Sequence, residues 1–114
     1  MNKIKLTLQE EGVLRLLYDR RGHVVSQKFV SASTGYNARS LRKIVERLGL
    51  KGFPIGSIKT GEERGYRYPL DEFQKLEGIK DNRVQAYSML NRVHAIESTD
   101  LEIAREKVLE VLGN

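Results

Sequence analysis

The spacing of apolar residues changes at Gly49 and Gly52, and this change limits the folds open to the chain. Before these glycines, apolar residues recur at the spacing of α-helices, whereas after them short stretches alternate as β-strands do. Helices followed by a little strand predict a mostly helical α+β fold. The chain has 114 residues, of which 39% are hydrophobic, so it has room for one domain with its own core and a short appendage.

Three helices are expected before these glycines, each with a capping residue in front of it. Their expected ranges are 8–20, 27–34 and 38–48, and their N-caps are Thr7, Ser26 and Asn37. The last helix is the most regular, because its apolar residues form one narrow stripe. The stripe consists of Ala38, Leu41, Ile44, Val45 and Leu48. The opposite face carries Arg39, Arg42, Lys43 and Glu46, which makes it basic.

Two short strands are expected at residues 55–58 and 66–68. The loop between them contains two glycines and four charged residues, a composition typical of an exposed hairpin tip. Pro69 lacks an amide hydrogen for a further strand bond and ends this unit. A short extended piece at residues 23–25 is expected before the second helix.

The sequence after residue 70 is helical in character. A short helix to about Glu77 and a break at Gly78 are expected, followed by a helix from about Asp81 to Glu97. Thr99 and Glu102 match a capping box in front of a last helix. The pattern therefore predicts a domain over 1–70 and a C-terminal helical hairpin within 71–114.

The charge is unevenly distributed along the chain. Residues 1–70 contain 14 Lys and Arg against 6 Asp and Glu, whereas residues 71–114 contain 6 against 9. A basic first part points to an anionic partner. Nucleic acid is preferred to a membrane, because no basic amphipathic helix with bulky apolar anchors is visible.

The composition argues against several classes of protein. There is no cysteine, and neither His23 nor His94 has a catalytic partner nearby in sequence. Lys59-Thr60-Gly61 and the S-x-x-K spacing from Ser40 to Lys43 resemble β-lactamase motifs, but the chain is too short for that fold. We expect no enzymatic activity, no metal and no cofactor. No segment approaches bilayer length, and we expect a soluble cytoplasmic protein without membrane contact.

Two short helices joined by a turn at Gly35, with a basic second helix and a following hairpin, are the parts of a winged helix-turn-helix. A helix fits the major groove of double-stranded DNA, where Arg and Lys meet base edges and phosphates. Candidate contacts in the recognition helix are Asn37, Arg39, Ser40, Arg42, Lys43 and Arg47. Candidate contacts at the start of the second helix and in the wing are Ser26, Gln27, Lys59, Thr60, Arg64 and Arg67.

The run from Val30 to Gly52, VSASTGYNARSLRKIVERLGLKG, resembles the helix-turn-helix of the biotin repressor type. The continuation FPIGSIKTGEERGYRYPL is similar to that family's wing, with its Gly-Tyr pair shortly before a proline. The resemblance covers about residues 8–70 and implies DNA binding through the helix over 38–48. The ligase part of bifunctional members has no counterpart here, so no biotin chemistry is implied.

Some positions depart from that family. Thr34 stands where an apolar residue is usual, and Asn37 stands where the family has Ser. Glu62 and Glu63 add negative charge to the wing tip, which opposes a phosphate contact. The wing therefore contacts DNA through its cations, contacts a protein, or points away from DNA.

Several alternatives stay open. The chain is either a sequence-specific regulator of bacterial or phage type, or a protein-interaction adaptor with only nonspecific DNA affinity. Tyr36, Tyr66 and Tyr68 either stack on bases of a single strand or pack on the core, and core packing is preferred. Residues 81–112 either form a homodimer, fold back over the core, or dock another protein.

Overall fold

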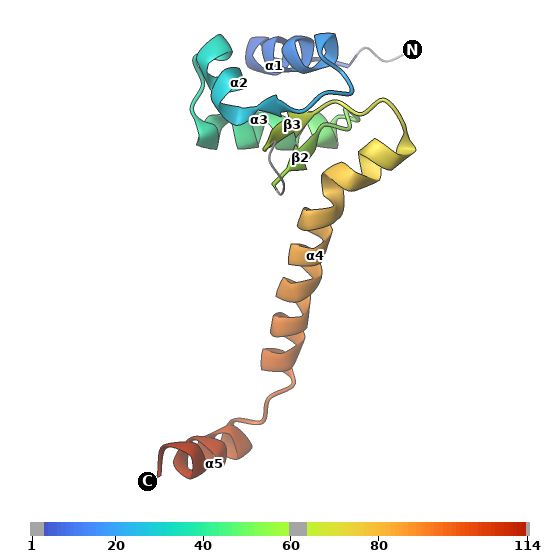
Figure 1. Ribbon diagram of the computed structural model, residues 1–114. Coiled ribbons are helices and arrows are strands. Elements are labelled where there is room, and N and C mark those ends of the chain that lie inside the picture. The colour runs from blue at the N-terminus through green and yellow to red at the C-terminus, as the bar shows by residue number, and fades with distance from the viewer. Residues whose placement is uncertain (1–3, 60–63, 114) are drawn as a thin grey trace. The chain divides into compact units, whose positions relative to one another are not determined.

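The computed structural model describes residues 4–59 and 64–113. In chain order its elements are α1 (Leu8–Asp19), β1 (Val25–Ser26), α2 (Gln27–Thr34), α3 (Ala38–Leu50), β2 (Gly56–Ile58), β3 (Gly65–Arg67), α4 (Glu72–Glu97) and α5 (Leu101–Leu112) (Figure 1). The expected mostly helical α+β class is confirmed. The chain divides into two compact units, Met1–Asp81 and Asn82–Asn114. The first unit thus extends beyond the boundary expected at residue 70.

The first three helices begin where their capping residues predict. The side chains of Thr7 and Ser26 each accept a hydrogen bond from the backbone N–H three residues later, at 3.1 Å. Asn37 does the same for Ser40 at 2.8 Å. α2 ends at Gly35, whose φ of 81° is in the left-handed region that glycine adopts without strain. Local capping interactions thus determine where α2 ends and where α3 begins, and so define the turn between them.

The sheet has three antiparallel strands in the order β1-β3-β2. Val25 of β1 and Ser57 of β2 both pair with Tyr66, on opposite sides of β3. The expected two-stranded hairpin is present as β2 and β3, but the pairing of a third strand, β1, with β3 was not expected. β1 has only two residues and shows no alternation of its own, so its pairing depends on β3. Gly65 allows β3 to approach β1 closely, because a side chain at this position would overlap the backbone of Val25.

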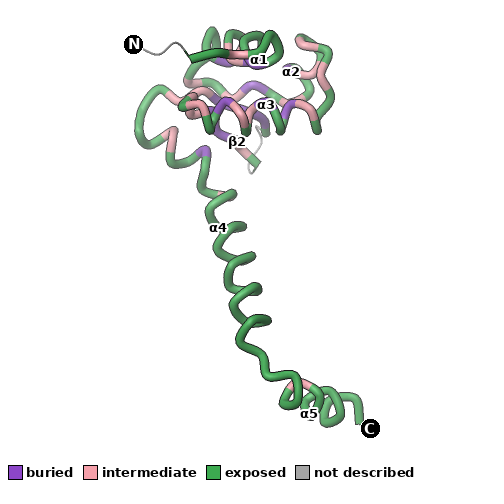
Figure 2. Tube along the Cα trace, turned by 180° about the vertical axis from the view of Figure 1, so that it is seen from behind, coloured by how far each residue is buried: buried purple, intermediate pink, exposed green. Residues whose placement is uncertain are grey.

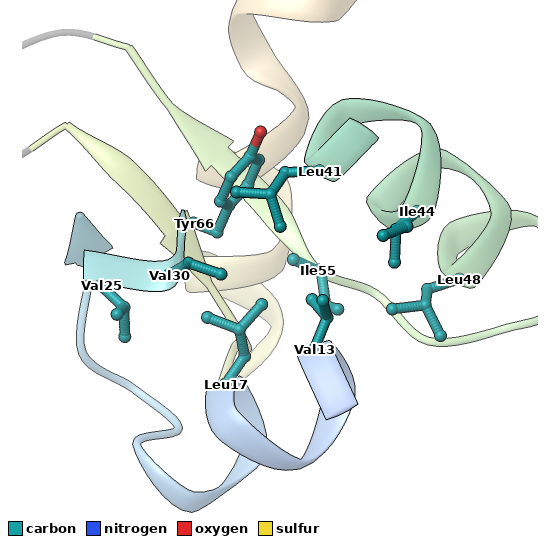
Figure 3. Packing of buried hydrophobic residues seen from close by; sticks show 9 residues of the cluster. All are labelled: Val13, Leu17, Val25, Val30, Leu41, Ile44, Leu48, Ile55 and Tyr66. Atoms are coloured by element: carbon teal, nitrogen blue, oxygen red, sulfur yellow. The ribbon is translucent and has the colours of Figure 1, made fainter. Parts of the chain in front are cut away.

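The core of the first unit lies between its helices and the sheet. Side chains from α1, α2, α3 and the sheet point into the same space (Figure 3). The buried apolar residues are Val13, Leu17, Val25, Val30, Leu41, Ile44, Leu48, Ile55 and Tyr66. Burying a large aliphatic side chain stabilises a fold by about 1.5–3 kcal/mol, so this cluster holds α3 in place.

α4 is continuous from Glu72 to Glu97, and the expected break at Gly78 was wrong. Glycine destabilises a helix interior by about 1 kcal/mol relative to alanine, which suggested the break. Gly78 instead lies against the backbone of β2. A Cβ atom at Gly78 would be 2.7 Å from the Cα of Gly56, and one at Gly56 would be 2.5 Å from the Cα of Gly78. The glycine pair therefore allows the start of α4 to pack on the sheet.

The second unit contains the rest of α4 and α5. Asp100, rather than the expected Thr99, caps α5 by accepting hydrogen bonds from the N–H groups of Glu102 and Ile103. The hydroxyl of Thr99 donates to the carbonyl of Ala95 at 2.7 Å and so belongs to the end of α4. Residues 82–113 are exposed except Ala104 (Figure 2), so the two helices lack the packing of the expected hairpin. None of the described helices combines the length and apolar character needed to cross a membrane.

The contact between Gly56 and Gly78 predicts that glycine-to-alanine substitutions at two helical positions change the free energy of unfolding in opposite directions. We expect Gly78→Ala to lower the free energy of unfolding by about 1–3 kcal/mol, because the methyl group meets the backbone of β2. The matched control is Gly12→Ala inside α1, where an added Cβ has no atom within 4 Å. That control should stabilise by up to about 1 kcal/mol. Urea unfolding measures both, and a Gly78→Ala protein as stable as the wild type would contradict this packing.

Candidate nucleic-acid interface

α3 has one buried and one charged face. Leu41, Ile44 and Leu48 are almost completely buried. Arg39, Arg42, Lys43 and Glu46 are exposed and follow one another at i, i+3, i+4 and i+7, which places them on one side of the helix. Three positive charges and one negative charge therefore face solvent from a helix that is anchored along its other side.

The start of α2 and the ends of the β2–β3 hairpin lie next to each other. Gln27, Lys59, Arg64 and Tyr66 line one shallow hollow, together with residues of β2. Gln27 is held by a hydrogen bond from its Nε2 to Ser31 Oγ at 2.7 Å. Ser26 lies one residue earlier, with its hydroxyl used as the cap of α2. The structure thus brings four of the expected DNA-binding residues together, namely Ser26, Gln27, Lys59 and Arg64.

Tyr66 connects this hollow to α3. Burial raises the pKa of its hydroxyl, and the positive charge of Arg42 opposes part of that rise. Arg42 is therefore within electrostatic range of the strand that follows the hairpin loop. Because only 5% of Tyr66 is exposed, this ring packs on the core and is not available for stacking on bases. Tyr68 is half-buried and forms an edge-to-face contact with Tyr18, with ring centroids 5.0 Å apart.

Arg67 does not belong to the surface on which the sequence placed it. It is buried, and its Nη2 lies 2.8 Å from Glu77 Oε1 and 3.0 Å from the carbonyl oxygen of Gln74. Alternation along β3 directs Tyr66 into the core and Arg67 to the other face, which α4 covers. Treating the sequence after residue 70 as a separate extension concealed this partner. The expected contact between Arg67 and DNA was therefore wrong.

Arg47 lies on the side of α3 that approaches α1. Its Nε is 3.8 Å from Glu10, a fully buried carboxylate. Lys51 Nζ contacts both oxygens of Glu10, at 2.7 and 2.9 Å, and also donates to the carbonyl of Lys5. The hydrogen bond from Lys51 lowers the pKa of Glu10, and burial opposes that effect. Arg47 is half-buried and contributes to this structural cluster, so it stands apart from the exposed cations of α3.

Sequence reasoning missed Glu10, although a signal was present. Glu10, Val13 and Leu17 are spaced by three and four residues, so the glutamate occupies a position on the apolar stripe of α1. An acidic residue at such a position needs a cationic partner when it is buried. Lys51, immediately after α3, provides it from 41 residues away in sequence.

Sequence reasoning also missed two polar residues, an arginine and a histidine, beside the hairpin. Arg20 and His23 line a second hollow together with Phe29 and Arg64. The guanidinium of Arg20 lies over the ring of Phe29, 5.0 Å from its centroid. Arg64 lines both hollows, so positive charge extends from Arg64 to Arg20 at the end of α1. Spacing alone gives no indication of this, because the chain segments meet only in the fold.

The remaining predicted contacts are at the ends of these elements. Asn37 is exposed in front of α3, and its Oδ1 is occupied by the cap of that helix. Ser40 is half-buried on the first turn of α3. Thr60, Glu62 and Glu63 lie outside the described residues. In the part of the chain that the structure describes, no three acidic or histidine side chains gather in a way that would hold a metal ion.

Comparisons with models of protein families, with curated proteins and with solved structures give no match to this chain.

The buried ion pair between Glu10 and Lys51 makes stability depend on pH. The pKa of Glu10 is lowered from 4.5 in the folded chain, so ionised Glu10 stabilises the fold above about pH 4.5. This contribution is lost as the pH falls through the lowered pKa. We expect Glu10→Gln to lower the urea midpoint at pH 7 and to make the decline in stability below pH 4.5 less steep.

The matched control is Glu11→Gln, which removes the same charge from an exposed pair with Arg15. It should change stability by no more than about 0.5 kcal/mol at pH 7 and leave the acid profile unchanged. Equal midpoints for Glu10→Gln and Glu11→Gln at pH 7 would contradict the structural role of Glu10.

Proposed function

We propose that this chain is a winged helix-turn-helix protein that binds double-stranded DNA and acts as a sequence-specific transcriptional regulator of bacterial or phage type. The observation that carries the proposal is the division of α3 into an apolar face anchored by the buried Leu41, Ile44 and Leu48 and an exposed face with three cations, namely Arg39, Arg42 and Lys43. α2, the turn at Gly35, α3 and the β2–β3 hairpin supply the parts of this fold in the required order.

In this proposal α3 enters the major groove. Arg and Lys side chains donate to the O6 and N7 atoms of guanine and to phosphates, and Arg39, Arg42 and Lys43 are directed to solvent for these contacts. The buried residues of α3 keep the helix from rotating, so the three cations reach a defined set of bases. Asn37 caps α3 through its carbonyl oxygen, which leaves its NH2 group to donate to a phosphate.

The hairpin and the start of α2 contact the DNA backbone. Lys59 and Arg64 supply positive charge beside the N-terminus of α2, where backbone N–H groups favour a phosphate. Ser26 and Gln27 lie at that same end. Arg20 and His23 extend the contact beyond Arg64. Such phosphate contacts position the protein and make binding depend on salt, whereas base contacts from α3 give sequence specificity.

A protein-interaction adaptor is the competing function. The observation that favours it is an apolar hollow beside α1, lined by Leu6, Leu14, Tyr18, Phe53 and Tyr68 and bordered by charged side chains. Such a hollow suits an apolar segment of another protein. An adaptor of this kind would bind DNA weakly and without sequence preference, through its positive charge alone.

Selection from a random duplex library at about 150 mM salt distinguishes the two functions. We expect the wild-type chain to enrich a sequence motif, and the triple variant Arg39→Ala, Arg42→Ala, Lys43→Ala to lose it. The matched control Arg83→Ala, Arg105→Ala, Lys107→Ala removes the same three charges from exposed positions in the second unit and should keep the motif. No enrichment by a folded wild-type chain would favour the adaptor.

Single substitutions separate base readers from phosphate-binding residues. Replacing a base-reading arginine of α3 by alanine should weaken binding by about 1–3 kcal/mol and relax the motif at one position. Lys59→Ala or Arg64→Ala should weaken binding to all sequences alike, and each substitution should reduce the salt slope by about 1. Titrations of a labelled duplex at several salt concentrations measure both effects. Loss of the motif on Lys59→Ala would contradict this assignment.

A further inference from the structure

The second unit leaves large apolar side chains exposed along both of its helices. Residues 82–113 are exposed apart from Ala104. Helices in proteins gain most of their stability from packing an apolar face on another surface. Contiguous exposed apolar surface in a soluble chain marks a site of interaction.

Three of these residues form a regular stripe on α4 together with Ala86. Ala86, Met89, Val93 and Ile96 are separated by three, four and three residues, which is the spacing of the a and d positions of a coiled coil. Met89, Val93 and Ile96 are 55%, 44% and 67% exposed. Leu101, Ala104, Val108 and Val111 repeat the same spacing on α5. A partner helix with the same spacing would cover either stripe.

Two charges flank the stripe on α4 and indicate which partner fits it. With Ala86 and Val93 at a, Arg92 occupies the g position and Glu97 the e position of the next heptad. Residues five apart do not face each other on one helix. Neither side chain forms an ion pair with any other residue within 4–59 and 64–113. In a parallel, in-register coiled coil, however, a g residue meets the e residue five positions later on the partner helix.

We propose that α4 pairs with α4 of a second copy of this chain, parallel and in register, through Ala86, Met89, Val93 and Ile96. Arg92 of each copy then forms an ion pair with Glu97 of the other, so the symmetric pair contains this interaction twice. An antiparallel pair would bring g positions together and form neither ion pair. The orientation of the pair therefore follows from charge complementarity across the stripe.

The overall charge is consistent with this location for the dimer contact. Residues 82–114 carry 4 Lys and Arg against 5 Asp and Glu, whereas residues 1–81 carry 16 against 10. Two nearly neutral segments can therefore approach each other without strong electrostatic repulsion. The proposal is independent of DNA binding, since association is measured on the chain alone.

Sedimentation equilibrium of the full chain tests the pairing. We expect a dimer for the wild type, and a weakening of the dimer by about tenfold for Arg92→Glu and for Glu97→Arg, which place like charges together. The double variant Arg92→Glu, Glu97→Arg should restore the wild-type dissociation constant. A monomeric wild type would overturn the proposal and point to a heterologous protein on the stripe. Failure of the double variant to recover would overturn the register.

A cysteine introduced into this cysteine-free chain tests the orientation. In a parallel, in-register pair Ile96→Cys places two thiols side by side, and oxidation should give a disulfide-linked dimer. The matched control Asn91→Cys lies at the f position, on the outer side of the helix, and should remain largely unlinked. More efficient linkage through Cys at 91 than at 96 would overturn the proposal. Circular dichroism of each variant verifies that the helices are retained.

Discussion

The burial of one face of α3 against α1 and the sheet is the contact on which the rest of the first unit depends. Leu41, Ile44 and Leu48 place that face inside the core. Because the helix is held by this face, its opposite face is exposed to solvent, and no other contact is needed to orient it. The turn at Gly35 and the cap at Asn37 only determine where the helix begins. Packing thus determines which charges are presented, and the proposed function uses those charges.

The first unit also contains two buried charges, and each of them has a partner of opposite charge. Glu10 pairs with Lys51 across the α1–α3 contact, and Arg67 pairs with Glu77 between the sheet and α4. A buried charge without a partner is strongly unfavourable, so each pair favours the native arrangement of the elements that it connects. Each pair occupies one cation, Lys51 or Arg67, in a contact within the fold. Net charge therefore overstates the number of positive groups available to a nucleic acid.

Local features of the fold were predictable from sequence, and long-range contacts were not. The capping residues and the apolar stripe of α3 depend on neighbours within a few positions, and the helices formed as these patterns indicated. An extended piece near β1 was expected, but its pairing with β3 was missed because two residues carry no periodic signal. The helix break expected at Gly78 was wrong for a similar reason, because the sequence near Gly78 does not reveal that this glycine packs on Gly56. The placement of Arg39, Arg42 and Lys43 on the exposed face of α3 was predicted correctly, whereas the position of Arg67 required knowledge of the helix that covers it.

The contact between Gly56 and Gly78 also limits how this sequence can change. When a large residue at a contact is enlarged further, a smaller residue opposite can often restore the room. Glycine is already the smallest residue, so neither position can compensate for a change at the other. The two sites should therefore behave as separately invariant positions in mutational libraries, and not as a covarying pair. Variants that escape this restriction need a shift of α4 along the sheet, which would also displace Glu77 from Arg67.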